Sequence, residues 1–353
     1  MSSASQKALL IPSKGANFEI GTRAIPKPGH GQVLVKVHAA ALNPVDKYIQ
    51  KAGVFVDEFP AVAGNDGAGT IEELGEGVTG VQKGDRVLLQ GLWVPDRGTF
   101  QQYVLGDAVR VAKIPSKYSF DEAATVPLTF ATAAIGLYGK KGAARGGAGL
   151  ARPWTASGRD KYKGNAALIV GGSSSVGRYA IQLAKLSGFG PIITTASSRN
   201  AEYAKSAGAT HVIDYHTTSY ADLPAAVAKI APSVPLVYDA IASPEAQEAS
   251  WKILAPKGSL ITTLEPSVGK LGEEAEDGKT VHFVFGSSNS PENYYISNDF
   301  YDHLTSLLDT GAIKPNRFEK LPGGLAAIPA GVERLGQGKV SGVKLVANPQ
   351  EGL

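Results

Sequence analysis

Cysteine is absent from the 353-residue chain, and this excludes several kinds of chemistry together. A chain without thiols forms no disulfide, offers no thiolate nucleophile and cannot hold zinc through cysteine. Long apolar runs are also missing. No segment approaches the roughly 20 apolar residues of a membrane span, and the start, MSSASQKALLIPSKG, lacks the apolar centre of a signal peptide. These absences predict a cytoplasmic protein without a membrane partner.

An excess of charge of one sign is missing as well. The formal net charge is +3, and the densest basic cluster, Lys140, Lys141 and Arg145, lies in a glycine-rich segment and not along a stripe. We therefore expect no nucleic-acid partner. The hydrophobic content of 43% and the charged content of 19% are those of an ordinary globular protein, and the length suggests two domains.

The first third of the chain has the pattern of an irregular β domain. Short apolar or alternating segments are interrupted by glycine, which is typical of a barrel or a sandwich. The expected strands lie within residues 31–42, 60–74, 84–90, 98–105 and 109–114. From Ser119 the pattern becomes helical, because a capping serine precedes Asp121, Glu122 and a run rich in alanine and leucine.

Residues 142–163 are rich in glycine and basic residues around Pro153-Trp154. Two interpretations are open for this segment. It is either a flexible surface loop or a lid that covers a ligand, since long loops in compact domains are often lids.

From residue 165 onward, short apolar strands alternate with helices. NAALIVGG, PIITTAS and HVIDY are strand-like, and an amphipathic helix with Ala180, Leu183 and Ala184 at helical spacing follows the first of them. Later strands are expected in PLVYDAI, SLITTL and VHFVFGS, and the chain closes with GVKLVA. This alternation predicts a parallel, doubly wound sheet. The predicted fold class is therefore α/β, with a separate β-rich domain.

The segment GGSSSVG (residues 171–177) stands between the first of these strands and its helix. Backbone N–H groups at a helix N-terminus bind phosphate. Gly172 permits a tight turn, Gly177 lets the helix pack close to the sheet, and Ser174 stands where the GxGxxG motif has its middle glycine. The segment lacks the Lys-Ser/Thr of a P-loop and the GxSxG frame of a hydrolase. It predicts a site for the pyrophosphate of a dinucleotide.

The second strand indicates which dinucleotide is bound. An NAD site usually carries Asp or Glu about 20 residues past the glycines, where the acid binds the ribose 2′-OH. Here the strand is followed by Ser197, Ser198 and Arg199, with no acid among them. Two hydroxyls and a guanidinium suit a 2′-phosphate, so the sequence favours NADPH. The alternative is that Arg199 is only a solvated residue at the start of a helix.

Three segments taken together resemble the medium-chain dehydrogenase/reductase superfamily over essentially the whole chain. They are LNPVD at residues 42–46, GNDGAGTIEELGEGVTGVQKGDRV at residues 64–87, and GGSSSVG at residues 171–177. The resemblance implies a GroES-like β-rich domain formed by residues 1–128 and 310–353, and a Rossmann domain formed by residues 129–309. It also implies that NADPH binds in the cleft between the two domains.

The same resemblance bears on zinc. Zinc-dependent members of the superfamily carry Cys where this chain has Asn43, and a His-Glu pair where it has Asn65-Asp66. A catalytic zinc needs three side-chain ligands and an open fourth position. The six histidines show no tight ligand spacing. The resemblance therefore implies a member of the zinc-independent branch.

Within that branch, LNPVD, PLTFATAAIGLY and the Pro153-Trp154 loop are most similar to fungal enoyl reductases, including those acting in trans with polyketide synthases. Tyr48, two residues after Asp46, instead matches the quinone oxidoreductases. The resemblance implies hydride transfer from NADPH to the activated C=C bond of an enal, enone or enoyl thioester, with a quinone as the alternative acceptor. The small-molecule substrate is either free or bound to a carrier protein, which the basic loop at residues 140–163 could dock. A non-enzymatic NADPH-binding protein is a further alternative, and both a monomer and a homodimer remain open.

Without a metal, the negative charge that develops on the substrate oxygen must be stabilised by oriented hydrogen-bond donors. Tyr48 is the expected donor and a candidate proton source, with water as its competitor. Asn43 and Asp46 are expected to orient the nicotinamide ribose and the Tyr48 loop, unless they form only a local Asx turn. Thr129 is expected on the nicotinamide side. The cofactor contacts implied by the motif or the resemblance are Pro44, Val45, Thr132, Gly172, Ser173, Ser174, Ser175, Val176, Ser197, Ser198, Arg199, Tyr215, Ile241, Val284, Phe285, Gly286 and Lys344.

Overall fold

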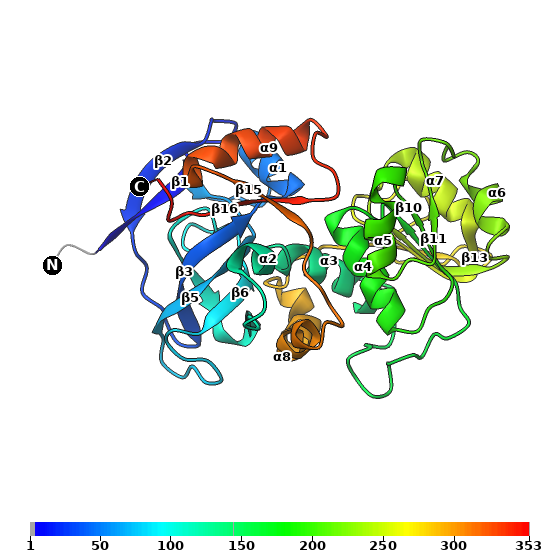
Figure 1. Cartoon of the computed structure of the whole chain (residues 1–353), viewed down its shortest axis with the longest axis horizontal. Coiled ribbons are helices and arrows are strands. Elements are labelled where there is room, and N and C mark those ends of the chain that lie inside the picture. The colour runs from blue at the N-terminus through cyan, green and yellow to red at the C-terminus, as the bar shows by residue number, and fades with distance from the viewer. Residues whose placement is uncertain (1–3, 144, 353) are drawn as a thin grey trace. The chain divides into compact units, whose positions relative to one another are not determined.

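The computed structural model of the chain describes residues 4–143 and 145–352. Five residues lie outside the described part of the chain. Residues 1–3 and 353 belong to the predicted β-rich domain, and residue 144 belongs to the 142–163 loop. The chain forms two compact units (Figure 1). The first unit contains residues 4–128, 287–309 and 315–352, and the second contains residues 129–286 and 310–314.

This division differs from the predicted ranges in two segments, and the first is residues 310–314, which the sequence assigned to the GroES-like domain but which belong to the second unit. The second is residues 287–309, which the sequence assigned to the Rossmann domain but which belong to the first unit. Arg110 Nη1 donates a hydrogen bond to Asn298 Oδ1 at 3.0 Å, and Asn289 Nδ2 donates to the Gln90 carbonyl oxygen at 2.8 Å. These polar contacts tie the segment to the strands of the β-rich unit.

The first unit is built on two sheets. In the larger sheet the strand order is β15-β16-β3-β5-β6-β8, with β7 paired to β3. Its strands are β3 (Gln32–Ala41), β5 (Asp66–Leu74), β6 (Arg86–Gln90), β7 (Tyr103–Asp107), β8 (Val111–Lys113), β15 (Phe318–Leu321) and β16 (Lys344–Ala347). The smaller sheet has the order β2-β1-β4 and consists of β1 (Ser5–Ile11), β2 (Glu19–Ala24) and β4 (Ala61–Val62).

Strand β3 organises the larger sheet. Val33, Val35 and Val37 alternate along it and are fully buried, as expected for a strand with one face on the core. β3 pairs antiparallel with β5 and also with β16, where Val346 lies opposite Ala41. The closing strand predicted from GVKLVA is thus confirmed, and it completes a sheet that begins near the N-terminus.

The helices of the first unit cover its sheets. They are α1 (Pro44–Ala52), α2 (Phe120–Ala124), α8 (Tyr294–Asp309) and α9 (Ile328–Gly336), with short turns η1 (Ala108–Arg110), η3 (Pro291–Asn293) and η4 (Gly324–Ala327). α1 lies beside α9 (Figure 1), and Lys47 Nζ is 3.7 Å from the Glu333 carboxylate. Ile49 of α1 and Val332 of α9 enter the same apolar core as β3.

The single helix predicted from Ser119 is in fact two helices. Ser119 caps α2 as expected, because its Oγ accepts the Glu122 N–H at 3.1 Å. α3 (Pro127–Tyr138) starts at Pro127. Proline lacks the N–H that would continue α2 but is well suited to the first turn of a new helix. α3 begins in the first unit and continues in the second.

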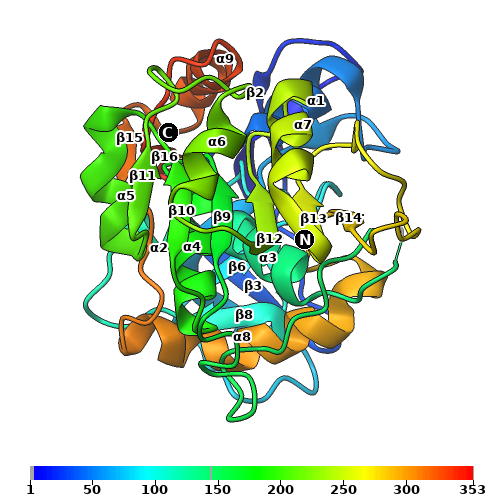
Figure 2. The same cartoon turned by 90° about the vertical axis from the view of Figure 1, so that its right-hand side faces the viewer.

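The second unit contains the predicted parallel, doubly wound sheet. Its strand order is β11-β10-β9-β12-β13-β14, which can be followed from edge to edge in Figure 2, and all neighbouring strands are parallel. The strands are β9 (Ala167–Val170), β10 (Ile192–Thr195), β11 (His211–Ile213), β12 (Val234–Asp239), β13 (Leu254–Thr262) and β14 (Thr280–Phe283).

Helices lie on both faces of this sheet. Figure 1 shows α4 (Ser175–Leu186) and α5 (Ala201–Ala207) on one face, and α6 (Leu223–Ala228) and α7 (Pro244–Ile253) on the other. The short turn η2 (Ser198–Asn200) leads into α5. Leu168 of β9 packs in one apolar core with Leu223 of α6 and Ala246 of α7. Among the described residues, no helix combines the length and the apolar character of a membrane span.

The described part of the 142–163 loop is packed against the rest of the second unit, to which it belongs. The Tyr162 ring stacks on Phe189 with centroids 4.9 Å apart, and its hydroxyl accepts the Ala151 N–H at 2.7 Å. The Trp154 and Tyr138 rings form a T-shaped contact, with centroids 5.2 Å apart. These contacts favour an anchored surface segment over a freely flexible loop, and a lid function stays a prediction.

Candidate functional site

The glycine-serine turn joins β9 to α4 at the carboxyl end of the sheet. Gly171 has a φ of +80°, a conformation that side chains other than glycine rarely adopt. Its N–H donates to Thr195 Oγ1 at 2.9 Å, and the Gly172 N–H donates to the Thr195 carbonyl oxygen at 3.0 Å. Ser174 caps α4, because its Oγ accepts the Gly177 N–H at 3.0 Å. The lone pair of Ser174 thus serves the helix, and its hydroxyl hydrogen remains a donor.

Two glycines of the turn occupy positions where a side chain would not fit. A Cβ on Gly172 would lie 2.0 Å from Thr194 Oγ1, and a Cβ on Gly177 would lie 2.3 Å from the Gly171 carbonyl oxygen. The first turn of α4 is therefore pressed against the backbone of the turn. The N–H groups and partial positive charge of a helix N-terminus are suited to a pyrophosphate. Ser173, Ser175 and Val176 complete this predicted site.

The segment after β10 has an acidic neighbour that the sequence pattern did not reveal. Ser197 is buried, whereas Ser198 and Arg199 are exposed. The Ser198 N–H donates to Asp214 Oδ2 at 2.9 Å, from the segment that follows β11. Hydrogen bonds from the His216 and Ser198 N–H groups lower the pKa of Asp214. A charged carboxylate therefore stands beside the predicted 2′-phosphate segment, and a bound phosphate there needs cations to offset it.

Ile241 packs against residues 171–177, the predicted phosphate-binding turn. Its side chain lies so close to Gly171 that a Cβ there would be 2.7 Å from Ile241 Cδ1. Asp239 Oδ1 accepts the N–H groups of Ile241 at 3.0 Å and Ala242 at 2.8 Å. This Asx turn positions Ile241, and Ala242 takes a φ of +55° within it. The aspartate at the end of a strand was the signal for this turn, although the sequence analysis did not single it out.

The buried carboxyl of Asp239 gives a testable pH dependence. Burial raises its pKa to about 6, from 3.8 for an ordinary aspartate. The unfolded chain ionises this carboxyl near pH 4, while the folded chain keeps it protonated until about pH 6. Wild-type stability should therefore fall through this window, by about 3 kcal/mol from this group.

Asp239→Asn keeps the oxygen that accepts both N–H groups but cannot ionise. Relative to wild type, its free energy of unfolding should rise by about 3 kcal/mol between about pH 4 and about pH 7. Urea unfolding across this range measures the difference. Glu248→Gln, on the exposed surface of α7, should follow the wild type. If the free energies of unfolding of Asp239→Asn and wild type differed by the same amount at every pH, the expectation would be wrong.

The structure brings together two of the residues predicted on the nicotinamide side, Thr132 and Gly286. Thr129 and Thr132 of α3 are buried, and the Tyr238 hydroxyl donates to the Thr132 carbonyl oxygen at 2.9 Å. Gly286 follows β14, and a Cβ on it would lie 2.0 Å from Thr132 Oγ1. Thr132 and Gly286 are therefore direct neighbours. Of the other two residues predicted after β14, Val284 is buried, and Phe285 lies under the Arg145 guanidinium at 4.8 Å.

Four polar side chains of the first unit form a buried network. Lys344 Nζ lies 2.6 Å from Asp66 Oδ2 and donates to Asn43 Oδ1 at 2.7 Å. Asn43 Nδ2 donates to Asp66 Oδ2 at 2.8 Å, and Asp66 Oδ1 accepts the Leu128 N–H at 2.6 Å. Asp46 Oδ2 accepts the Asn43 N–H at 2.7 Å, and burial raises the pKa of Asp46 to about 7. Asn43, Asp46 and Lys344 thus hold one another, and their predicted contacts with the cofactor stay predictions.

Tyr48 is placed differently from these residues. It lies on α1, which Pro44 and Val45 open, and its side chain is 57% exposed. Its hydroxyl makes no hydrogen bond within the described part of the chain, so the O–H is available to a ligand. Tyr215 is also exposed, with its ring 4.4 Å from the His216 ring.

The positions that hold zinc in zinc-dependent relatives do not fit a metal here. Asn65 Oδ1 accepts the Trp93 Nε1–H at 2.8 Å, and Asp66 is paired with the Lys344 ammonium. A divalent cation on Asp66 would face that fixed positive charge, with no thiolate to help bind it. Over residues 4–143 and 145–352, no group of three or more histidine, aspartate or glutamate side chains is placed to hold a metal ion.

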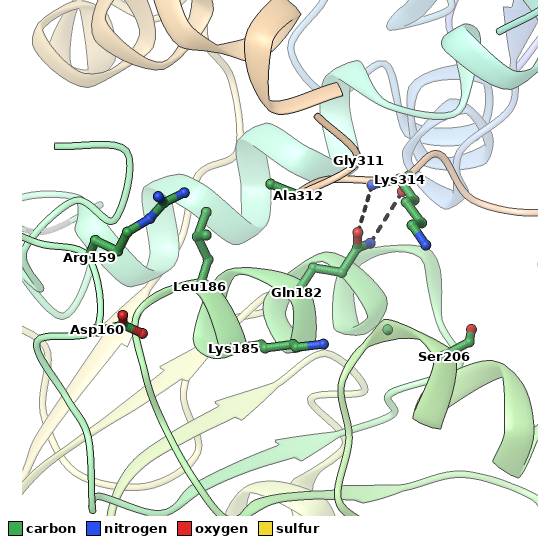
Figure 3. A pocket seen from close by; sticks show the side chains of 10 residues that line it. Arg159, Asp160, Gln182, Lys185, Leu186, Ser206, Gly311, Ala312 and Lys314 are labelled. Atoms are coloured by element: carbon green, nitrogen blue, oxygen red, sulfur yellow. Dashed lines mark hydrogen bonds between the residues drawn. The ribbon is translucent and has the colours of Figure 1, made fainter. Parts of the chain in front are cut away.

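A hollow of about 360 Å³ lies at the far end of α4 (Figure 3). Gln182 connects two of its walls, because its side chain both donates to and accepts from the Lys314 backbone, at 3.2 and 2.7 Å. Lys185 and Ser206 also line it. At a rise of about 1.5 Å per residue, this end of α4 is roughly 15 Å from the phosphate-binding turn. No predicted site residue lines the hollow, so it is distinct from the predicted dinucleotide site.

Known proteins match the chain in both units. The sequence profile described as alcohol dehydrogenase GroES-like domain matches residues 29–116, and that described as zinc-binding dehydrogenase matches residues 175–270. Dehydrogenase orsE of Emericella nidulans is 31% identical over 97% of this chain and 99% of its own length. Trans-enoyl reductase tndF of Aspergillus flavipes is 33% identical over 96% of this chain and 98% of its own. The solved quinone oxidoreductase of Coxiella burnetii has a TM-score of 0.73 at 26% identity, covering 97% of this chain and 99% of that one. The predicted fold class, a GroES-like β-rich domain with a Rossmann domain, is confirmed.

Proposed function

The chain belongs to the medium-chain dehydrogenase/reductase superfamily and is an oxidoreductase of that superfamily, and from this premise we propose a narrower activity. It is a zinc-independent, NADPH-dependent reductase that transfers a hydride to the activated C=C bond of an enal, enone or enoyl thioester. The observation that carries the proposal is the buried network in which the Lys344 ammonium pairs with Asp66 and Asn43. With that charge at the zinc-ligand positions, the substrate oxygen must be polarised by hydrogen-bond donors.

The residues of the second unit suit the dinucleotide. The turn at residues 171–177 and the first turn of α4 offer backbone N–H groups to the pyrophosphate. Ser198 and Arg199 are exposed and offer donors to a 2′-phosphate. When bound, NADPH supplies the hydride from the nicotinamide ring. The likeness to trans-enoyl reductase tndF supports a C=C bond as the acceptor.

The first unit supplies the donor for the substrate. The exposed Tyr48 hydroxyl donates a hydrogen bond to the substrate carbonyl oxygen, and this bond strengthens as negative charge develops there. The proton that completes reduction comes from Tyr48, with solvent water as the competing source. A quinone is the second candidate acceptor, because Tyr48 matches the quinone oxidoreductase pattern and the fold matches a solved quinone oxidoreductase.

The loss of NADPH absorbance tests this proposal with a panel of acceptors: a 2-enal, an aryl enone, an enoyl thioester and a benzoquinone, each also with NADH. We expect turnover of at least one conjugated carbonyl compound, with kcat/KM at least about 10-fold higher for NADPH than for NADH, which corresponds to about 1.4 kcal/mol. Activity with benzoquinone alone would move the chain to the second candidate.

Carrier-dependent reduction needs its own comparison. If free substrates fail, the same acyl chain on an acyl carrier protein should be turned over, and high salt should slow it, because the loop at residues 140–163 is basic. Tight NADPH binding without turnover of any free or carrier-bound substrate would contradict the enzyme proposal and favour a non-enzymatic NADPH-binding protein.

A further inference from the structure

Arg178 on α4 is a buried arginine without an acidic partner in the described part of the chain. The residue is 6% exposed, and its Nε and Nη1 make no hydrogen bond with the described residues. The guanidinium lies over the ring of Tyr203, 4.3 Å from the centroid. An aromatic ring contacts the flat face of the guanidinium and leaves the N–H groups along its edge for an acceptor.

Two physical costs accompany this arrangement. A buried charge without a partner is costly, because it has lost water and gained no counter-charge. In addition, Arg178 stands near the N-terminus of α4, where the partial positive charge of the helix opposes a further cation. A neutral side chain of similar length would pack on Tyr203 without either cost. The position is therefore suited to an anion that comes from outside the chain.

The contact with Tyr203 shows where that anion would lie. Tyr203 is in the first turn of α5, directly after the segment that contains Ser198 and Arg199. Arg178 itself directly follows Gly177 in the phosphate-binding turn. Tyr203, over whose ring the guanidinium lies, follows Arg199 by four residues, which is about one helical turn or roughly 6 Å of rise from the segment to which the proposed function assigns the 2′-phosphate.

The charges around this segment point the same way. Asp214 accepts the Ser198 N–H and remains ionised beside the segment. Arg199 is exposed, so solvent screens its charge. A buried guanidinium is screened far less than an exposed one, and it holds its donors in a fixed fork that matches phosphate.

We propose that Arg178 binds the 2′-phosphate of NADPH and is a main determinant of selectivity for NADPH over NADH. This inference rests on the proposed function, since it assigns a residue to the cofactor named there. In the sequence, Arg178 stands where a P-loop motif has lysine, and no motif assigns it a role. The burial of its side chain, which no motif predicts, gives it this role.

Calorimetric binding of two cofactor fragments to the full chain tests the assignment without any turnover. 2′,5′-ADP carries the 2′-phosphate, and ADP carries the pyrophosphate without it. Arg178→Gln should weaken the binding of 2′,5′-ADP by about 50-fold and change the affinity for ADP by less than about 3-fold. It should also raise the melting temperature of the ligand-free chain, because an unpaired buried charge is removed.

Two further variants keep the test sharp. Arg178→Lys retains the charge but not the forked guanidinium, so the affinity for 2′,5′-ADP should fall by about 5-fold to 10-fold. This variant preserves the fold if Arg178→Gln does not. Arg159→Gln removes an exposed arginine at the hollow of Figure 3 and should bind both fragments like the wild type.

Three results would overturn the inference, and they are distinguishable. Equal weakening of both fragments by Arg178→Gln would place the guanidinium on the pyrophosphate. Unchanged binding of both, with a lower melting temperature, would show that Arg178 only packs on Tyr203. If wild type binds 2′,5′-ADP no more tightly than ADP, the NADPH assignment of the proposed function fails together with this one.

Discussion

Gly177→Ala is expected to weaken the binding of NADPH and of ADP by about 100-fold, which corresponds to about 2.7 kcal/mol. The new Cβ would lie 2.3 Å from the Gly171 carbonyl oxygen, a backbone atom that cannot rotate away. The first turn of α4 must therefore move off the phosphate-binding turn. Backbone N–H groups stabilise a phosphate only when they point at it from hydrogen-bond distance, so the displaced helix loses most of its contribution.

Fluorescence titration with NADPH and calorimetry with ADP measure this loss. Circular dichroism should show an intact fold, because overpacking of this kind costs about 1–3 kcal/mol and not the whole stability. Gly29→Ala is the matched control: its Cβ meets only the Gln32 side chain, at 3.3 Å, in the first unit. Wild-type affinity in Gly177→Ala would show that the dinucleotide does not bind at this turn.

Lys344→Met is expected to lower the free energy of unfolding of the first unit by about 3–5 kcal/mol, since it leaves a buried carboxylate without its counter-charge. The Lys344 and Asp66 side chains are 3% and 0% exposed, so solvent cannot replace the ammonium. Hydrogen exchange of the β3 and β5 amides, together with urea unfolding, measures the loss locally and globally.

A second substitution separates the charge from the packing. The double variant Lys344→Met with Asp66→Asn removes both charges and should recover part of the stability lost in Lys344→Met alone. Lys339→Met, at an exposed lysine of the same C-terminal segment, should change stability by less than about 0.5 kcal/mol. If Lys344→Met were as stable as Lys339→Met, the buried pair would contribute nothing to the fold.

The local sequence pattern was sufficient to predict the parallel sheet of the second unit. Its strands are short apolar runs bounded by glycine, and the positions of the glycines in residues 171–177 predict a dinucleotide-binding turn. Both are properties of neighbouring residues, and the structure confirms the parallel sheet they predicted. The close approach of Gly172 to Thr194 crosses two strands, but it follows from the strand-turn-helix unit itself.

Other features depend on contacts that no local pattern contains. Lys344 meets Asp66 because β16 and β5 both pair with β3, and no spacing in the sequence links the two residues. α1 was missed because Ile49 is its one buried apolar side chain, beside the buried polar Asp46 and Gln50, so it lacks an apolar stripe. Asp214 reaches Ser198 only through the pairing of β10 with β11. The residues that follow β10 therefore did not predict that Asp214, which follows β11, lies beside them.

The pairing of β16 with β3 also delays completion of the larger sheet during synthesis of the chain. A ribosome releases β3 and Asp66 before the second unit and Lys344 after it, so the larger sheet waits for β16 while the second unit has already emerged. During that interval the edge of β3 that β16 will cover is open, and the carboxylate of Asp66 has no ammonium to bury with. Until β16 emerges, the nascent N-terminal sheet is therefore open to mispairing and to chaperones.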